Sequence, residues 1–223
     1  MRVLIISVHP DDETLGCGGT ILKHKARGDD LHWLIATEGF EPDWSADVLA
    51  KKAREVEQVA EAYGIKQFYK AGFHTTRLDN LPQSTLIDGI RTVIATVKPE
   101  VIYLVHAGDV HTDHLAIFTA TLSVVKSFYM QHWGVRRILS YETLSSTEAA
   151  PPQHYRAFVP NVYNDITPYL EQKQNIMKLY SSEAQSALAP RGNSAIEALA
   201  RFRGASIDVK YAEAFMLIRE VMA

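Results

Sequence analysis

The sequence predicts an α/β fold, with a mostly parallel sheet covered by helices on both faces. Short apolar runs rich in β-branched residues alternate with longer segments of helical period along most of the chain. This alternation, at this spacing, is typical of a parallel sheet that is buried on both sides. A chain of 223 residues is long enough to bury a large core. It shows no linker or repeat, so we expect one domain over residues 1–223.

The strands are predicted from short apolar runs that end at turn signals. The first run, at residues 3–8, reads Val-Leu-Ile-Ile-Ser-Val and ends at His9 and Pro10. Similar runs predict strands at residues 31–37, 66–71, 101–106 and 137–142. Residues 158–165 are expected to form an edge strand, because Pro160 has no backbone N–H to donate within a sheet.

The helices are predicted from apolar residues at helical spacing and from their stop signals. Gly28 and Gly64 follow the first two helical segments, and Pro99 follows the third. The expected helices are residues 14–27, 44–63, 84–97, 112–131, 168–182, 194–203 and 211–222, the last of them amphipathic.

The composition excludes several classes of protein. With 23 Lys and Arg against 26 Asp and Glu, the net charge of -3 gives no basic surface for nucleic acid. No apolar stretch approaches the ~20 residues of a membrane span, and the short run before His9 is not a signal peptide. The single cysteine, Cys17, is expected to be a small buried hydrophobic residue. We therefore expect a cytoplasmic protein with a small-molecule substrate and no nucleic-acid or membrane partner.

The strongest functional signal directly follows the first expected strand, where the chain reads His9, Pro10, Asp11, Asp12 and Glu13. An imidazole and two adjacent carboxylates lose solvation at the end of a buried strand, and partners or a metal must compensate. A divalent cation gives that compensation, and a carboxylate that does not bind it is free to act as a base. The alternative is that these acids begin a helix and are stabilised by its dipole, an interpretation we keep for Glu13.

A second cluster, His111, Asp113 and His114, follows the fourth expected strand. The carboxyl ends of parallel strands meet at one edge of a sheet, so we expect both clusters to lie together there. His111 and His114 are three residues apart and share a face if a helix begins there. The alternative for this cluster is a helix cap and a partly buried ring.

Taken together, the clusters predict a metal-dependent hydrolase. A catalytic zinc site uses three protein ligands and keeps one position for water. His9, His114 and one of Asp11 or Asp12 supply two imidazoles and a carboxylate, a set that suits Zn²⁺ and is also accepted by Fe²⁺. The other aspartate can take a proton from water as a general base. The residues alone leave the choice between Asp11 and Asp12 open.

The remaining groups of the clusters have roles in the same chemistry. A protonated His111 can stabilise an oxyanion, and Asp113 can orient an imidazole through a hydrogen bond. Gly16, Gly18 and Gly19 do not form a phosphate-binding loop, because neither of the known glycine patterns is present. Close packing of a helix on a strand explains them better, which disfavours a dinucleotide site.

These motifs resemble those of the LmbE-like (PIG-L) N-deacetylase family. Residues 9–19 match its His-Pro-Asp-Asp-Glu motif with the Thr-Leu-Gly-x-Gly-Gly stretch that follows, and residues 111–114 match its His-x-Asp-His motif. The order of strands and helices over residues 1–142 is similar to the Rossmann-like fold of that family. The resemblance implies a zinc-dependent N-deacetylase formed by a single LmbE-like domain.

The resemblance also implies a role for each matched residue. It implies that the zinc ligands are His9, Asp12 and His114. It implies that Asp11 is the general base, that His111 faces the oxyanion, and that Asp113 orients a histidine.

Substrate contacts are expected in the loops over the strand ends. The predicted contacts are Arg54, His74, Arg77 and Arg191. Relatives carry an arginine near the start of the second helix, where this chain offers Lys52 or Arg54. They also carry a late His-Pro-Arg-Ser segment, which appears here as Ala-Pro-Arg-Gly at residues 189–192. Further candidates in these loops, Glu38, Phe40 and Trp44, fit the polar groups and aromatic face that a sugar needs.

The predicted activity is removal of the acetyl group from an N-acetylglucosamine-type sugar, which gives acetate and a free amine. One alternative is a metal-dependent amidase acting on a non-sugar or aminoglycoside-like amide. Another is a metal-binding or nucleotide-binding protein without catalytic activity. The apolar segments at residues 158–163 and 211–222 are candidates for a homo-oligomer interface, or equally for the core.

Overall fold

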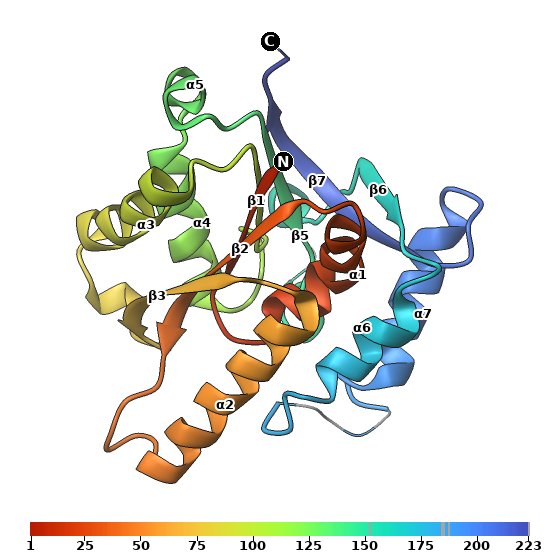
Figure 1. The fold of residues 1–223 in the computed structure, drawn as a ribbon, viewed down its shortest axis with the longest axis horizontal. Coiled ribbons are helices and arrows are strands. Elements are labelled where there is room, and N and C mark those ends of the chain that lie inside the picture. Colours follow the sequence, from red (N-terminus) through yellow and green to blue (C-terminus); the bar gives the residue numbers. More distant parts are fainter. Residues whose placement is uncertain (152, 184–185, 187, 223) are drawn as a thin grey trace.

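The computed structural model describes residues 1–151, 153–183, 186 and 188–222. Within these residues, one seven-stranded sheet has the strand order β3-β2-β1-β4-β5-β7-β6 (Figure 1). The strands are β1 Arg2–Ser7, β2 Asp30–Glu38, β3 Gln67–His74, β4 Val101–Leu104, β5 Arg137–Tyr141, β6 Val162–Asp165 and β7 Ala212–Glu220. β1 to β5 pair in parallel, whereas β7 runs antiparallel to β5 and β6. The predicted α/β class with a mostly parallel sheet is confirmed.

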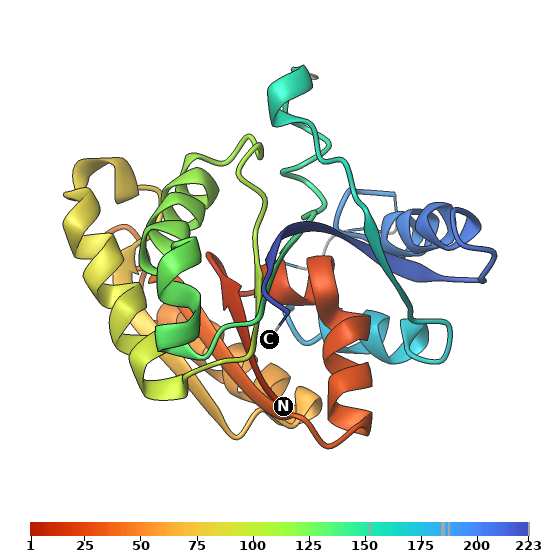
Figure 2. The same cartoon turned by 90° about the horizontal axis from the view of Figure 1, so that it is seen from above.

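Helices cover both faces of the sheet, as predicted (Figure 2). They are α1 Asp12–Ala26, α2 Ala46–Tyr63, α3 Gln83–Val97, α4 Thr112–Val124, α5 Met130–Trp133, α6 Leu170–Met177 and α7 Asn193–Ala205. α3 and α4 pack together on one face, while α1 packs with α2 and α6 on the other and α7 packs against β7. None of the helices in the described part of the chain has the length and apolar character needed to cross a lipid bilayer.

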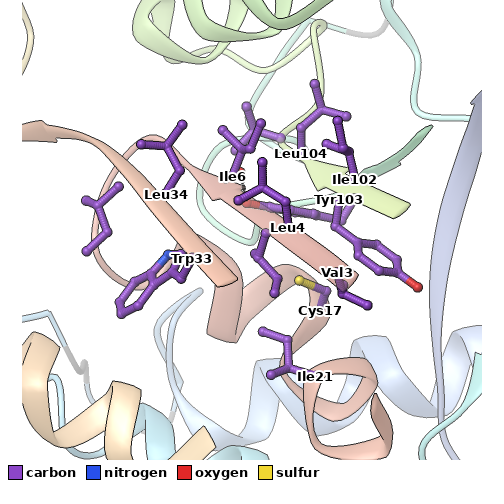
Figure 3. Packing of buried hydrophobic residues seen from close by; sticks show 14 of the residues in the cluster. Val3, Leu4, Ile6, Cys17, Ile21, Trp33, Leu34, Ile102, Tyr103 and Leu104 are labelled. Atoms are coloured by element: carbon purple, nitrogen blue, oxygen red, sulfur yellow. Dashed lines mark hydrogen bonds between the residues drawn. The ribbon is translucent and has the colours of Figure 1, made fainter. Parts of the chain in front are cut away.

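The core lies on both faces of the central strands, with α1 on one face and α3 and α4 on the other (Figure 3). Leu4 and Ile6 of β1 and Leu34 of β2 are fully buried, because helices cover the sheet on both sides. Each such side chain contributes about 1.5–3 kcal/mol through its removal from water. Cys17 of α1 points into the same core and has no exposed surface, which confirms its prediction as a buried hydrophobic residue.

The first helix is interrupted near its start, at the glycine-rich stretch. Cys17 has φ -141° and ψ 21°, which is not helical backbone. The carbonyl oxygen of Leu15 accepts a hydrogen bond from Lys173 Nζ at 2.9 Å. A Cβ added to Gly16 would lie 2.1 Å from the Tyr141 ring, so the helix approaches the sheet too closely there for any side chain. This close packing confirms the structural interpretation of the glycines.

The second segment of α1 begins against a buried carboxylate, that of Glu213 in β7. Glu213 accepts hydrogen bonds at 2.8 and 2.7 Å from the backbone N–H groups of Gly19 and Thr20. These groups lie just after the interruption, in a turn where N–H groups would otherwise need other partners. Lys173 of α6 pairs with the same carboxylate at 2.7 Å, and both side chains are buried. The ion pair, with its hydrogen bonds to the backbone of α1, therefore links α1 to α6 and β7.

The amphipathic helix predicted over residues 211–222 is wrong, because most of this segment forms β7. Alanine, glutamate, leucine and methionine favour helices, and this composition suggested the wrong structure. The segment instead fills the gap between β5 and β6, where Leu217 lies opposite Leu139 and Phe215 lies opposite Val162. Pairing on both sides satisfies its backbone, and Phe215 is buried. Sheet context overrides the helical propensity here.

The helix predicted over residues 112–131 is also shorter than expected. α4 ends at Val124, and a 3₁₀ turn at Ser127–Tyr129 and the short α5 follow it. Val125 leaves the helical region and is fully buried, and the Trp133 indole N–H donates to the carbonyl oxygen of Val124 at 3.1 Å. The edge strand expected over residues 158–165 is present as β6, at the end of the sheet.

Candidate active site

The two predicted clusters meet at the carboxyl edge of the sheet. His9 follows β1, and His111 and His114 lie at the start of α4, after β4. The ring centroids of His9 and His111 are 4.4 Å apart, and those of His9 and His114 are 5.5 Å apart. One ring nitrogen from each of the three residues lies within 4.8 Å of the others, which is close enough to hold a metal ion. The expectation that these distant segments form one pocket is confirmed.

Asp12 adds a carboxylate to this group. Its Oδ2 accepts hydrogen bonds from the backbone N–H groups of Val8 at 3.0 Å and His9 at 2.8 Å. The same oxygen lies 3.5 Å from His114 Nε2 and 3.7 Å from His9 Nδ1. Two atoms bound at ~2.0 Å to a tetrahedral zinc ion are about 3.3 Å apart, so these separations fit such an ion closely. Two sets of candidate metal ligands therefore share this site. One is the two imidazoles of His9 and His114 with the Asp12 carboxylate, and the other is the three imidazoles.

Buried aspartates fix the orientation of both imidazoles. His9 Nε2 lies 3.4 Å from Asp113 Oδ2, and His114 Nδ1 lies 2.7 Å from Asp109 Oδ2. A carboxylate accepts hydrogen bonds, so the proton of each neutral ring belongs on the nitrogen that faces its aspartate. His9 Nδ1 and His114 Nε2 are then unprotonated, and both lie near Asp12. Hydrogen bonds of this kind, on the far side of the ring, are typical of histidines that bind metals.

Asp109 was missed by the sequence analysis, because a lone aspartate in a loop gives no periodic or spacing signal. It is buried, and its Oδ1 accepts a hydrogen bond from the Thr147 hydroxyl at 2.6 Å. We expect Asp109→Asn to weaken the binding of a divalent metal ion by roughly 10- to 100-fold, because the amide orients and polarises the His114 ring less well. Competition with a chromophoric chelator measures this change. Asp88→Asn, on an exposed position of α3, is the matched control, and equal affinity in both variants would contradict the assignment.

Asp11 lies next to the candidate metal ligands and has a strained backbone conformation. Its φ of 120° is rare for a residue with a side chain, and its backbone N–H donates to Glu13 Oε2 at 3.2 Å. Its carboxylate is buried, and Oδ2 accepts a hydrogen bond from Arg191 Nη1 at 2.9 Å. Burial and the neighbouring charge of Asp12 raise the pKa of Asp11 well above its usual value, although Arg191 opposes them. A raised pKa makes this carboxylate a stronger base.

Glu13 lies beneath the site and holds the backbone of the first motif. It has no exposed surface, and its Oε1 accepts hydrogen bonds from the hydroxyls of Thr14 at 2.6 Å and Tyr180 at 2.8 Å. Burial raises the pKa of Glu13 to about 7, although these hydrogen bonds oppose the rise. Its contacts fit the structural role predicted for it.

His111 caps the start of α4 and is the third imidazole of the group. Its Nδ1 accepts a hydrogen bond from the backbone N–H of Asp113 at 3.3 Å. Burial, together with the nearby rings of His9 and His114, lowers the pKa of His111 to about 4. This shift favours the neutral ring over the protonated imidazole that the sequence predicted, and the role of His111 toward an oxyanion stays a prediction. Because Nδ1 is an acceptor, the proton of this ring lies on Nε2 and can still be donated.

A cavity of about 770 Å³ opens over these residues. Its walls come from the segments after β1, β2, β3, β4 and β5, from α2, and from the segment between α6 and α7. Among the predicted substrate contacts, Arg191 lines the cavity, whereas Arg54, His74 and Arg77 do not. Arg54 is exposed on α2, and of the two basic residues offered at that helix start it is Lys52 that lines the cavity.

His74 and Arg77 instead hold one wall of the cavity in place. His74 Nε2 lies 3.2 Å from Asp43 Oδ2, and Arg77 donates to the same carboxylate. The His74 ring packs against Phe40 and Trp44, with centroid distances of 5.3 and 6.0 Å. Both aromatic residues line the cavity. In this structure, therefore, His74 and Arg77 act on the site through the loop that carries Phe40 and Trp44.

Comparison with known proteins identifies the family. The sequence profile of the PIG-L family, described as GlcNAc-PI de-N-acetylase, matches residues 4–125, which is more than half of the chain. The chain belongs to the PIG-L family. The matched region contains both histidine clusters and every candidate metal ligand described above. This confirms the predicted family and its class of reaction, the hydrolysis of an amide bond.

Individual relatives support the same assignment. The uncharacterized deacetylase YaiS of Escherichia coli K12 is 25% identical over 186 residues, covering 81% of this chain and 90% of that protein. The diacetylchitobiose deacetylase of Thermococcus kodakarensis is 24% identical over 227 residues, covering 97% and 83%. The solved structure of the N,N'-diacetylchitobiose deacetylase of Pyrococcus horikoshii superposes with a TM-score of 0.76 at 22% identity, covering 97% and 83%. The PIG-L chain described here therefore shares its fold with enzymes of known structure.

Proposed function

We propose that this PIG-L protein removes the acetyl group from an N-acetylated amino sugar of the N-acetylglucosamine type, releasing acetate and a free amine. One observation carries the proposal. Two oriented imidazoles and the Asp12 carboxylate face one another, and beside them lies a buried carboxylate, Asp11, that faces Arg191 instead of the histidines. The names of relatives that act on N-acetylated sugars support the substrate class.

We assign His9, Asp12 and His114 as the ligands of a divalent cation, with Zn²⁺ as the resident ion and Fe²⁺ as the alternative. The ligand set of two imidazoles and one carboxylate suits zinc and leaves a coordination position for water. When bound, such an ion supplies a Lewis acid that polarises the amide carbonyl and lowers the pKa of a water molecule. Asp113 and Asp109 orient His9 and His114 for this role.

The other residues move protons and stabilise charge. Asp11 takes the proton from the water that attacks the carbonyl carbon, and its Arg191 partner holds the carboxylate in one orientation. The neutral His111 donates its Nε2 proton in a hydrogen bond to the amide oxygen as that oxygen gains negative charge. When the carbon–nitrogen bond breaks, Asp11 returns its proton to the leaving nitrogen. The carbon–oxygen bond formed by the attacking water remains, so the acyl part leaves as acetic acid, which releases its last proton to solvent as acetate, and the sugar leaves as the free amine.

The direct test is release of acetate and amine by the whole protein, assayed with N-acetylglucosamine and N,N'-diacetylchitobiose. We expect stoichiometric release of both products, loss of activity after treatment with a chelator, and recovery on addition of Zn²⁺. N-acetylated peptides serve as the matched non-sugar amides. If acetate comes only from the peptides, the protein is an amidase of another class. If no substrate yields acetate from the zinc-loaded protein, the proposed function is wrong.

A further inference from the structure

The cavity has a second wall that the deacetylation chemistry does not use. Asp11, His111 and the assigned metal ligands follow β1 and β4, which are neighbours in the parallel part of the sheet. Phe40 and Trp44 follow β2, one strand further toward the β3 edge, and both line the cavity. The cavity volume of about 770 Å³ lies high in the range of ~300–1,000 Å³ for ligand pockets. A single sugar ring with its acetamide is small for such a space.

The aromatic wall, formed by Phe40 and Trp44, is partly exposed, but contacts with neighbouring residues fix its position. Phe40 is 38% exposed, and its ring packs on His74, which also contacts Trp44. His74 and Arg77 both bind the carboxylate of Asp43, which lies between the two aromatic residues in the sequence. An exposed aromatic face that is fixed in advance suits the apolar C–H face of a sugar ring, since little side-chain freedom is lost on stacking.

The charges along the cavity argue against an acidic substituent. Each lysine or arginine among the described lining residues already has a carboxylate partner. Lys70 Nζ lies 3.5 Å from Glu38 Oε2, and Lys52 binds Glu183. Arg191 binds both Glu183 and Asp11, each at 2.9 Å. A phosphate or carboxylate on the substrate would meet cations whose charge is already balanced by these carboxylates, whereas an uncharged group needs no free cation.

We infer that the wall formed by Phe40 and Trp44 is a subsite for a second, uncharged sugar ring of the substrate. The enzyme then prefers an N-acetylated amino sugar that is joined to a neutral sugar over one that carries an acidic group. This inference rests on the proposed function and specifies its substrate class. The electroneutral ion pairs set the charge preference, and the aromatic wall sets the preference for a ring.

Three substrates separate the preference for a second ring from the preference against an acidic group: N-acetylglucosamine, N,N'-diacetylchitobiose and N-acetylglucosamine 1-phosphate. We expect kcat/KM for the disaccharide to exceed that for the monosaccharide by about tenfold, and the phosphate to be the poorest substrate. In Trp44→Ala and Phe40→Ala, the ratio of disaccharide to monosaccharide kcat/KM falls about fivefold. The control is Phe128→Ala, whose ring is 72% exposed and does not line the cavity; its ratio matches that of the unaltered enzyme.

A gain of activity tests the charge argument without disturbing the aromatic wall. Glu38→Gln releases Lys70, so we expect kcat/KM for the phosphate to rise relative to that for the disaccharide. The subsite is overturned if the unaltered enzyme hydrolyses monosaccharide and disaccharide equally well, or prefers the phosphate. Those results leave the deacetylase activity standing. If none of the three substrates yields acetate, the proposed function is wrong, and the inferred subsite is wrong as well.

Discussion

Replacing Asp11 with asparagine will lower kcat/KM by about 10²–10⁴-fold, because a positioned base contributes an effect of that size. The asparagine side chain is almost the same size and can still accept a hydrogen bond from Arg191, so the shape of the cavity is retained. It cannot take a proton from water at neutral pH. The zinc content will remain near that of the unaltered protein, since Asp11 faces Arg191 and not the paired histidines.

The matched variant is Asp12→Asn, one residue further along the same motif. Its Oδ2 lies 3.5 Å from His114 Nε2, so this variant will lose zinc as well as activity. Acetate release gives the activity of both variants, and elemental analysis after gel filtration gives their zinc content. If Asp11→Asn loses zinc and Asp12→Asn keeps it, the roles of the two aspartates are exchanged. If Asp11→Asn keeps full activity, Asp11 is not the base.

Replacing Lys173 with methionine will lower the free energy of unfolding by about 3–5 kcal/mol, because it leaves a buried carboxylate without its charged partner. Glu213 is 5% exposed, and Lys173 is 3% exposed. Lys173 also binds the Leu15 carbonyl oxygen at the interruption of α1, so the variant leaves that group without its donor. Urea unfolding, followed by circular dichroism, measures the loss.

An exposed ion pair is the control for this variant. Arg91 and Asp88 pair on the surface of α3, and Arg91→Ala will change the stability by less than ~1 kcal/mol. The double variant of Lys173→Met with Glu213→Gln will lose less stability than the two single variants together, since it removes the unpaired charge. Strictly additive losses, or a loss from Lys173→Met no larger than that of the control, would contradict the role of the ion pair.

The centre of the site could be predicted from the sequence because of two local signals and one rule of topology. His9 and Asp12 directly follow a short buried strand, and His114 follows another. Parallel strands bring their carboxyl ends to one edge, which is enough to place these residues together. The partners of the histidines could be predicted only in part. Asp113 stands within the second motif, whereas the pairing of Asp109 with His114 appears only in the folded structure.

The parts that sequence reasoning missed depend on contacts between distant segments. β7 consists largely of helix-forming residues, and only the open edge of β5 makes it a strand. Arg191 was expected to contact substrate, and it lines the cavity, but its hydrogen bond to Asp11, 180 positions away, could not be predicted. The burial of Glu213 against Gly19 and Thr20 likewise joins the two ends of the chain. Such pairs leave no periodic pattern, so they emerge only from the folded structure.

The most direct test of the metal site is an anomalous-difference map from crystals of the zinc-loaded protein, measured at the zinc absorption edge. We predict one strong peak at about 2.0–2.2 Å from His9 Nδ1, Asp12 Oδ2 and His114 Nε2. A peak bound by His111 in place of Asp12 would contradict the assigned ligands. A map without any peak among these residues would contradict the claim that the two distant segments form a metal site.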